Sequence, residues 1–188
     1  MDGSVFALDH YLIKQTSYFN TWRYHIQDEV GNNIAYATAT RLFSLKPNIQ
    51  VFTDDSKSKL LFSFQKNKIF SFFPLYTVID NMGNTIGKIC REFTFFKITF
   101  KVIDKNGMPI GRALEETVSM IIGGALKSGK SLTNFDIFIG DKNIGRCNRS
   151  WATIKDSYDL TIFDDSAKAL DRRLVLALAI ILDVDLGR

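Results

Sequence analysis

Nine consecutive apolar residues, LVLALAIIL at positions 174–182, decide the fold predicted for this chain. A helix over this run has no polar face, so it must be buried on all sides. The run is also far shorter than the roughly 20 residues that span a bilayer. We therefore predict a buried core helix of about 18 residues. We expect it to begin behind a cluster of N-cap residues, Asp164-Asp165-Ser166.

The sequence before this helix alternates with the period of two that is typical of strands. Within 94–102, for example, Phe100 and Val102 share one face, and Lys97 and Lys101 share the other. About twelve short strands are predicted in this way. They lie near 10–16, 22–28, 34–40, 48–53, 60–66, 72–79, 85–91, 94–104, 109–117, 133–139, 143–149 and 158–163.

One turn sequence recurs between these strands, with the spacing D-x-x-G-x-x-I. It occurs at 28–34, 80–86 and 104–110, and a shortened form occurs at 140–144. The Asp side chain caps such a turn, and the Gly takes the positive φ that closes a hairpin. In the last three copies another Gly follows the Ile, which predicts a bulge or a close backbone approach as the strand leaves the turn.

Composition excludes several classes of protein. With 188 residues, 46% of them hydrophobic and 23% charged, the chain is long enough for one globular domain and unlike disordered or collagen-like sequences. Two cysteines, Cys90 and Cys147, are too few for a disulfide framework or a structural zinc site. We read them as reduced thiols of a cytoplasmic protein. The N-terminal sequence has no basic start and no long apolar run, so we expect no signal peptide.

Charge is concentrated in the middle of the chain. Residues 64–155 hold fourteen basic and seven acidic side chains, whereas residues 156–188 hold four basic and seven acidic ones. A basic middle suits the phosphates of a membrane surface or of nucleic acid, although a merely solvated surface explains it equally well. Nucleic acid is the weaker reading, because no binding motif and no dense stripe of Arg and Lys is present.

These features together predict a mainly β fold: an antiparallel barrel of about twelve strands around the hydrophobic C-terminal helix. Such a barrel is wider than side chains alone can fill, so the helix is its natural plug. The pattern resembles the tubby C-terminal-like superfamily, most of all its LURP-one-related branch. The segments that carry the resemblance are FSFFPLYTVIDNMGNTIGKICRE (70–92), FDIFIGDKNIGRCNRSW (135–151) and LVLALAIILDVD (174–185). It implies a single domain over residues 1–188.

The resemblance also implies a class of ligand. Tubby domains bind phosphoinositide headgroups through basic side chains, and the related phospholipid scramblases act on bilayer lipids with calcium. This chain lacks the cysteine cluster of the scramblases. Asp164, Asp165 and Asp171 do not have the alternating spacing of a calcium loop, and they are better read as carboxylates at a helix N-terminus.

Four lysines are the candidate anion-binding residues. Lys97 and Lys101 share the polar face of one predicted strand, about 14 Å apart. Lys127 and Lys130 lie in the glycine-rich stretch 118–132, whose pattern fits a strand followed by a loop rich in glycine and lysine. Backbone amides and two ammonium groups in such a stretch suit an anionic headgroup.

The same stretch also matches a different class of protein. Residues 124–131 read GALKSGKS, which satisfies the phosphate-binding loop G-x-x-x-x-G-K-S. That loop needs a helix starting behind it so that amides face the phosphates. Here the strand-like FDIFIG follows at 135–140. A nucleotide hydrolase is therefore the least favoured reading. His10, His25 and the two cysteines form no catalytic pattern, so no catalytic residue is predicted.

Three functions remain in order of preference. The first is a non-enzymatic cytoplasmic module, without metal or cofactor, whose basic middle docks on anionic phospholipid at the membrane periphery or on a phosphorylated ligand. The second is a scaffold that binds a protein partner. The third is the nucleotide hydrolase.

Overall fold

The computed structural model describes most of the chain. The described residues are 5–16, 21–40, 48–67, 73–93, 98–116, 134–151, 156–165 and 168–186. Its strands are β1 (His10–Gln15), β2 (Thr21–Gln27), β3 (Asn33–Thr40), β4 (Asn48–Phe52), β5 (Leu60–Lys66), β6 (Leu75–Asp80), β7 (Thr85–Phe93), β8 (Ile98–Asp104), β9 (Pro109–Glu116), β10 (Asn134–Ile139), β11 (Lys142–Trp151) and β12 (Asp156–Ile162).

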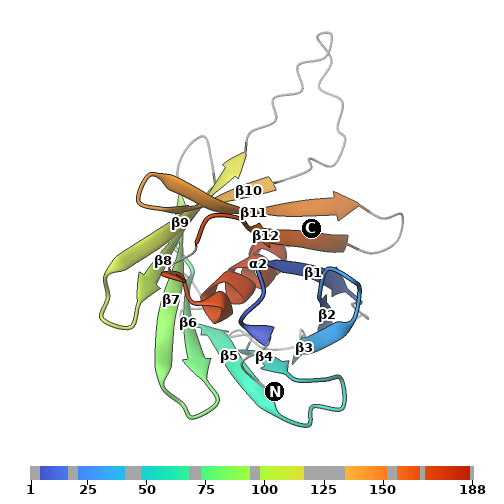
Figure 1. Ribbon diagram of the computed structural model, residues 1–188. Coiled ribbons are helices and arrows are strands. Elements are labelled where there is room, and N and C mark those ends of the chain that lie inside the picture. Colours follow the sequence, from blue (N-terminus) through green and yellow to red (C-terminus); the bar gives the residue numbers. More distant parts are fainter. Residues whose placement is uncertain are drawn as a thin grey trace.

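The twelve strands form a closed antiparallel barrel, as predicted. Each strand pairs with its neighbours in sequence, and β1 pairs with β12 to close the ring. Helix α2 (Arg172–Leu186) lies inside this ring (Figure 1). Leu174 to Leu182 are each at most 1% exposed, because the inward side chains of the strands surround them. Tyr24, Phe62 and Phe100 are three of those inward residues, each 0% exposed.

The helix begins later than the sequence predicts. Its N-cap is Asp171, whose Oδ1 accepts a hydrogen bond from the backbone N–H of Arg173 at 2.9 Å. Asp165 instead accepts the backbone N–H groups of Ala169 and Leu170, before the helix. The predicted cap at Asp164-Asp165-Ser166 is therefore wrong. The carboxylate of Asp165 is used to bend the chain between the end of β12 and the helix.

The recurring turns have the geometry predicted for them. In the β6–β7 turn, Oδ1 of Asp80 accepts the backbone N–H groups of Met82 and Asn84 at 2.9 and 2.8 Å. Gly83 has a φ of 91°, a conformation that side chains with a Cβ rarely adopt. Asp28 and Asp104 accept the corresponding N–H groups in their own turns.

A bulge follows each of five hairpin turns. In the β6–β7 hairpin, Val78 faces Gly87 and Ile79 faces Thr85, so Ile86 has no partner across the ladder. The bulged residues at the equivalent places are Ile34, Leu61, Ile86, Ile110 and Ile144. They are buried or packed against the core, so the bulge turns an apolar side chain inward near the barrel rim.

The glycine after the bulge permits a close backbone approach. A Cβ on Gly87 would lie 2.5 Å from the carbonyl oxygen of Ile103 and 3.1 Å from methyl groups of Leu174. At Gly87 the wall of the barrel therefore packs closely against the first turn of α2.

Candidate anion-binding end of the barrel

The barrel has two chemically different ends. At one end, which we call the turn end, lie the hairpin turns and the described residues between β12 and α2: residues 28–32, 53–59, 80–84, 104–108, 140–141, 163–165 and 168–171. These sequences hold ten acidic residues and only four basic ones. The acidic residues are Asp28, Glu29, Asp54, Asp55, Asp80, Asp104, Asp141, Asp164, Asp165 and Asp171.

At the other end, which we call the connection end, the remaining strand ends meet, among them Lys66 of β5 and Glu116 of β9. The sequences that join these strand ends are 16–20, 41–47, 67–74, 94–97, 117–133 and 152–155. They hold seven basic residues and no acidic residue. The basic residues are Arg41, Lys46, Lys68, Lys97, Lys127, Lys130 and Lys155.

Of the four lysines predicted to bind an anion, one lies among the described residues. Lys101 is on the outer face of β8, where its side chain is 48% exposed and its Nζ lies 2.6 Å from Oε1 of Glu92. Lys97, Lys127 and Lys130 lie outside the described residues, so their proximity to one another stays a prediction.

The strand ends that flank those lysines are neighbours. The backbone N–H of Ile98, which opens β8, donates to Oε2 of Glu115 near the end of β9 at 3.0 Å. Asn134, which opens β10, pairs with Glu116. The described strand ends on the C-terminal side of Lys97 and on both sides of residues 117–133 therefore lie at the same end of the barrel, on adjoining strands.

Two arginines on β9 and β11 also have acidic partners. Arg112 lies 3.1 Å from Asp141, and Nε of Arg146 lies 2.7 Å from Asp136. A cation that already pairs with a carboxylate attracts a second anion less strongly. The outer wall is thus less suited to phosphate than the sequence alone indicates.

A polar cluster lies inside the connection end, around the last turn of α2. Asp185 receives three groups from the barrel: Nζ of Lys66 at 3.3 Å, Nη1 of Arg91 at 3.1 Å and the hydroxyl of Tyr76 at 3.0 Å. We call Lys66, Tyr76, Arg91 and Asp185 the mouth cluster. Burial, and next the negative charge of Asp185, raise the pKa of the Tyr76 hydroxyl, so it remains a donor.

Asp183 is held in a similar way, deeper in the barrel. It accepts hydrogen bonds from the hydroxyls of Tyr24 and Tyr158 and from Nε2 of Gln15 at 2.7 Å. Asp183 is only 6% exposed. Burial and the neighbouring carboxylate raise the pKa of Tyr24 well above its ordinary value, which keeps this hydroxyl protonated.

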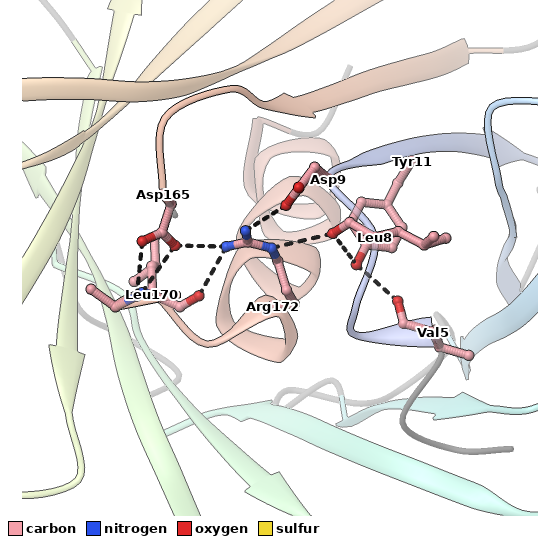
Figure 2. Close-up of polar contacts among 8 residues, drawn as sticks. Val5, Leu8, Asp9, Tyr11, Asp165, Leu170 and Arg172 are labelled. Carbon is pink, nitrogen blue, oxygen red and sulfur yellow. Dashed lines mark hydrogen bonds and ion pairs between the residues drawn. The ribbon is translucent and has the colours of Figure 1, made fainter. Parts of the chain in front are cut away.

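At the turn end, Arg172 connects three parts of the chain (Figure 2). Its guanidinium lies 2.7 Å from Asp165 and 2.6 Å from Asp9, and it also donates to the carbonyls of Leu8 and Leu170. Since Arg172 is 3% exposed, this charge is neutralised inside the protein. The cluster ties the N-terminal segment and the β12–α2 segment to the helix.

Sequence reasoning missed the roles of Arg172, Asp183 and Asp185. One signal was available: two acidic residues at the C-terminal end of a helix oppose the helix macrodipole, so they need cations or hydroxyls from elsewhere. The sequence does not show which strands supply them.

The cysteines do not resemble nucleophiles. Burial raises the pKa of the Cys147 thiol to about 12 and also raises the pKa of the Cys90 thiol. Within the described ranges, no group of His, Cys, Asp and Glu is arranged to hold a metal ion. Among those residues there is likewise no helix with the length and apolar character needed to cross a membrane.

Comparison with protein families identifies one whose model covers this barrel and most of its helix. The model of the LURP-one-related family covers residues 10–183, from the first residue of β1 to the last turns of α2. The chain belongs to the LURP-one-related family. This family is part of the tubby-like superfamily, so the resemblance inferred from the sequence is confirmed. No curated protein matches this LURP-one-related chain.

The family match includes the segment that resembles a phosphate-binding loop. Residues 124–131 lie outside the described residues, but the strands on either side are described. β9 and β10 pair antiparallel, with Asn134 facing Glu116. In this LURP-one-related barrel the segment thus joins two antiparallel neighbours, whereas the nucleotide-binding loop joins a strand to a helix in a parallel unit.

Proposed function

We propose that this LURP-one-related domain is a non-enzymatic module that docks on anionic phospholipid headgroups through its connection end. The observation that supports this function best is the separation of charge along the barrel. Acidic residues predominate in the turn-end sequences, and only basic residues occur among the charged residues of the connecting sequences at the other end. Such a charge distribution orients a protein on a negative surface, because one end is attracted and the other is repelled.

The residues that accompany this charge fit the same function. The connecting sequences contain eight aromatic residues: Tyr18, Phe19, Phe43, Phe70, Phe72, Phe73, Phe95 and Phe96. Aromatic and basic side chains together are typical of segments that bind at the interface of a membrane. We propose Lys97, Lys127 and Lys130 of the connecting sequences, together with Lys101 on the outer face of β8, as headgroup ligands. Lys101 is the weakest of them because Glu92 already pairs with it.

Co-sedimentation with vesicles tests the proposal. The purified chain is mixed with phosphatidylcholine vesicles that contain phosphatidylserine, phosphatidylinositol bisphosphate or neither, at low and at physiological salt. We expect binding to the anionic vesicles only. Binding that survives physiological salt would indicate a headgroup site, whereas binding lost with salt would indicate diffuse charge.

Charge-reversal variants supply the matched control. Lys127→Glu with Lys130→Glu changes the connection end, and Lys57→Glu with Lys105→Glu makes the same change in charge at the exposed turn end. We expect the first pair to weaken vesicle binding and the second pair to leave it unchanged. Equal losses would contradict docking through the connection end.

One observation favours a second function, a scaffold for a protein partner. Exposed apolar side chains occur at the turn end: Val30, Met82, Met108 and Phe163 are 77%, 82%, 63% and 60% exposed. Flexible methionine side chains suit adaptable protein contacts. If the chain ignores all vesicles, and a co-purifying protein is lost from the variant Met82→Ser with Met108→Ser, the scaffold replaces the lipid module.

A further inference from the structure

We infer that Lys66 and Arg91 bind a phosphate group at the connection end, and that Asp185 competes with this phosphate from within the protein. The inference rests on the proposed function and names a site within it. Lys66 ends β5, and Arg91 lies near the end of β7, so both cations are carried by rigid strands next to the basic connecting sequences.

The exposure of the mouth cluster makes its cations accessible. The side chains of Lys66 and Arg91 are 23% and 25% exposed, whereas the side chain of Asp185 is 5% exposed. The carboxylate therefore lies beneath the two cations, and an anion that arrives from outside meets the cations first.

The contacts of the two cations leave donors for a second acceptor. Asp185 receives one nitrogen of Arg91 at 3.1 Å and the single nitrogen of Lys66 at 3.3 Å, on different carboxylate oxygens. A guanidinium carries five N–H groups and an ammonium three. A phosphate monoester, with three acceptor oxygens and a charge near −2, suits two cations that diverge from one point.

Arg172 at the turn end shows the contrast. It lies 2.7 and 2.6 Å from two carboxylates, donates to two carbonyl groups and is 3% exposed. That cluster is closed and structural. The mouth cluster has longer single contacts and partly exposed cations, which is the arrangement of a site that can exchange one anion for another.

Asp185 can also release its cations without losing every partner. The Tyr76 hydroxyl donates to Asp185 at 3.0 Å and comes from a side chain that is 1% exposed. When a phosphate draws Lys66 and Arg91 outward, this hydrogen bond still satisfies one oxygen of the carboxylate. The helix macrodipole disfavours an acidic group at the C-terminal end of a helix. Stabilisation of α2 therefore does not explain why an aspartate occupies position 185.

Three variants and one control test the inference in the full chain. Asp185→Asn removes the competing charge and retains an acceptor for Tyr76, while Arg91→Gln and Lys66→Gln each remove one cation. Asp141→Asn is the control, because it removes the carboxylate from the exposed ion pair between Arg112 and Asp141 at the turn end.

The probes are of two kinds. Binding to vesicles with phosphatidylinositol bisphosphate is measured by co-sedimentation, and binding of inorganic phosphate and of inositol trisphosphate is measured by calorimetry. Thermal melting checks that each variant is folded.

We expect Asp185→Asn to raise affinity roughly three- to tenfold, the effect of removing one like charge from a partly screened site. Arg91→Gln and Lys66→Gln lower affinity, and Asp141→Asn leaves it unchanged. A gain on inorganic phosphate as well as on vesicles identifies phosphate itself as the ligand, and a gain on vesicles alone identifies the lipid headgroup.

Three results would overturn the inference. If the wild type binds vesicles but the mouth-cluster variants bind equally well, the proposed function stands and this site is excluded. Equal gains for Asp185→Asn and Asp141→Asn would likewise exclude a local competitor. If neither the wild type nor Asp185→Asn binds any of the probes, the proposed function fails and the site fails with it.

Discussion

Arg172 carries a positive charge into the barrel because carboxylates and carbonyls from two other segments meet it there. The side chain of Asp165 is as buried as that of Arg172, with exposures of 2% and 3%, whereas Asp9 on the other side is 62% exposed. Removing one partner from a buried pair leaves the other charge without compensation. At the scale of single residues, this pair is where a substitution affects stability most.

Replacing Arg172 with Met tests this interpretation. We expect the free energy of unfolding to fall by about 3–5 kcal/mol, the cost of leaving a buried carboxylate unpaired. Arg173→Met is the control: Arg173 and its partner Asp171 are about one-third exposed, so we expect a loss of less than about 1 kcal/mol. Urea denaturation measures both. Similar losses for the two variants would contradict a structural role specific to Arg172.

The buried thiol of Cys147 makes stability depend on pH in alkaline solution. Folding raises its pKa from 9.0 to about 12, so between these values the folded chain retains a proton that the unfolded chain has lost. Stability from this group is full below pH 9 and declines as the pH rises, by about 1.4 kcal/mol per pH unit. We expect Cys147→Ala to lose this slope, so the difference in the free energy of unfolding between the wild type and the variant should change with pH above pH 9. Parallel curves above pH 9 would contradict the prediction.

At the scale of elements, the hairpin is the repeating unit of the barrel. Each of the five bulged hairpins places an apolar residue against the core just after its turn. Glycine serves two different purposes in the β6–β7 hairpin: Gly83 adopts a positive φ in the turn, and Gly87 makes room for the backbone of β8.

Replacing each glycine with Asn distinguishes the need for positive φ from the need for space. At Gly83 there is open space and Asn tolerates positive φ, so we expect Gly83→Asn to cost less than about 1 kcal/mol. At Gly87 any Cβ meets the Ile103 carbonyl, and we expect Gly87→Asn to cost roughly 1–3 kcal/mol through overpacking. Chemical denaturation measures the free energy of unfolding of both variants. If Gly83→Asn were the more damaging variant, the close approach at Gly87 would not matter for stability.

At the scale of the whole molecule, twelve strands enclose the helix and the β1–β12 pairing closes the ring. Because residues 174–182 are covered on all sides, water reaches their amides only when the barrel opens. The helix is thus expected to belong to the most stable cooperative unit of the protein.

Hydrogen–deuterium exchange tests this expectation. Amides in residues 175–182 should exchange with the free energy of global unfolding, and amides of the exposed 80–84 turn should exchange rapidly. Global stability from urea denaturation supplies the reference value. Faster exchange in α2 than in the strands would mean that the helix leaves the barrel while the barrel remains folded.

Local patterns made most of this fold predictable. Alternation along residues such as Ile98 to Val102 identified the strands, and the D-x-x-G-x-x-I spacing identified the turns, because both depend on neighbours in sequence. The start of the helix was wrong since two competing caps, Asp165 and Asp171, occur within six residues of each other, and only the path from the barrel wall to its axis selects Asp171.

The candidate site was much less predictable. The basic middle of the chain directed attention to lysines, and of these Lys101 has Glu92 as a partner on the adjacent strand. The mouth cluster joins Lys66, Arg91 and Asp185, which are far apart in sequence, and no local pattern connects residues separated by 94 and 119 positions.

The sequence by itself determined the strands, their turns and a helix that has to be buried, since backbone preference and side-chain periodicity act over a few residues. It also determined the charge of every connecting segment. Only the tertiary structure decided which charges meet. Closing the ring brings together the strand ends that flank the connecting sequences, and threading α2 through the barrel carries Asp183 and Asp185 to that end. The physical reason is that electrostatic partners are selected by distance in space, and that distance exists only once the barrel has closed around its helix.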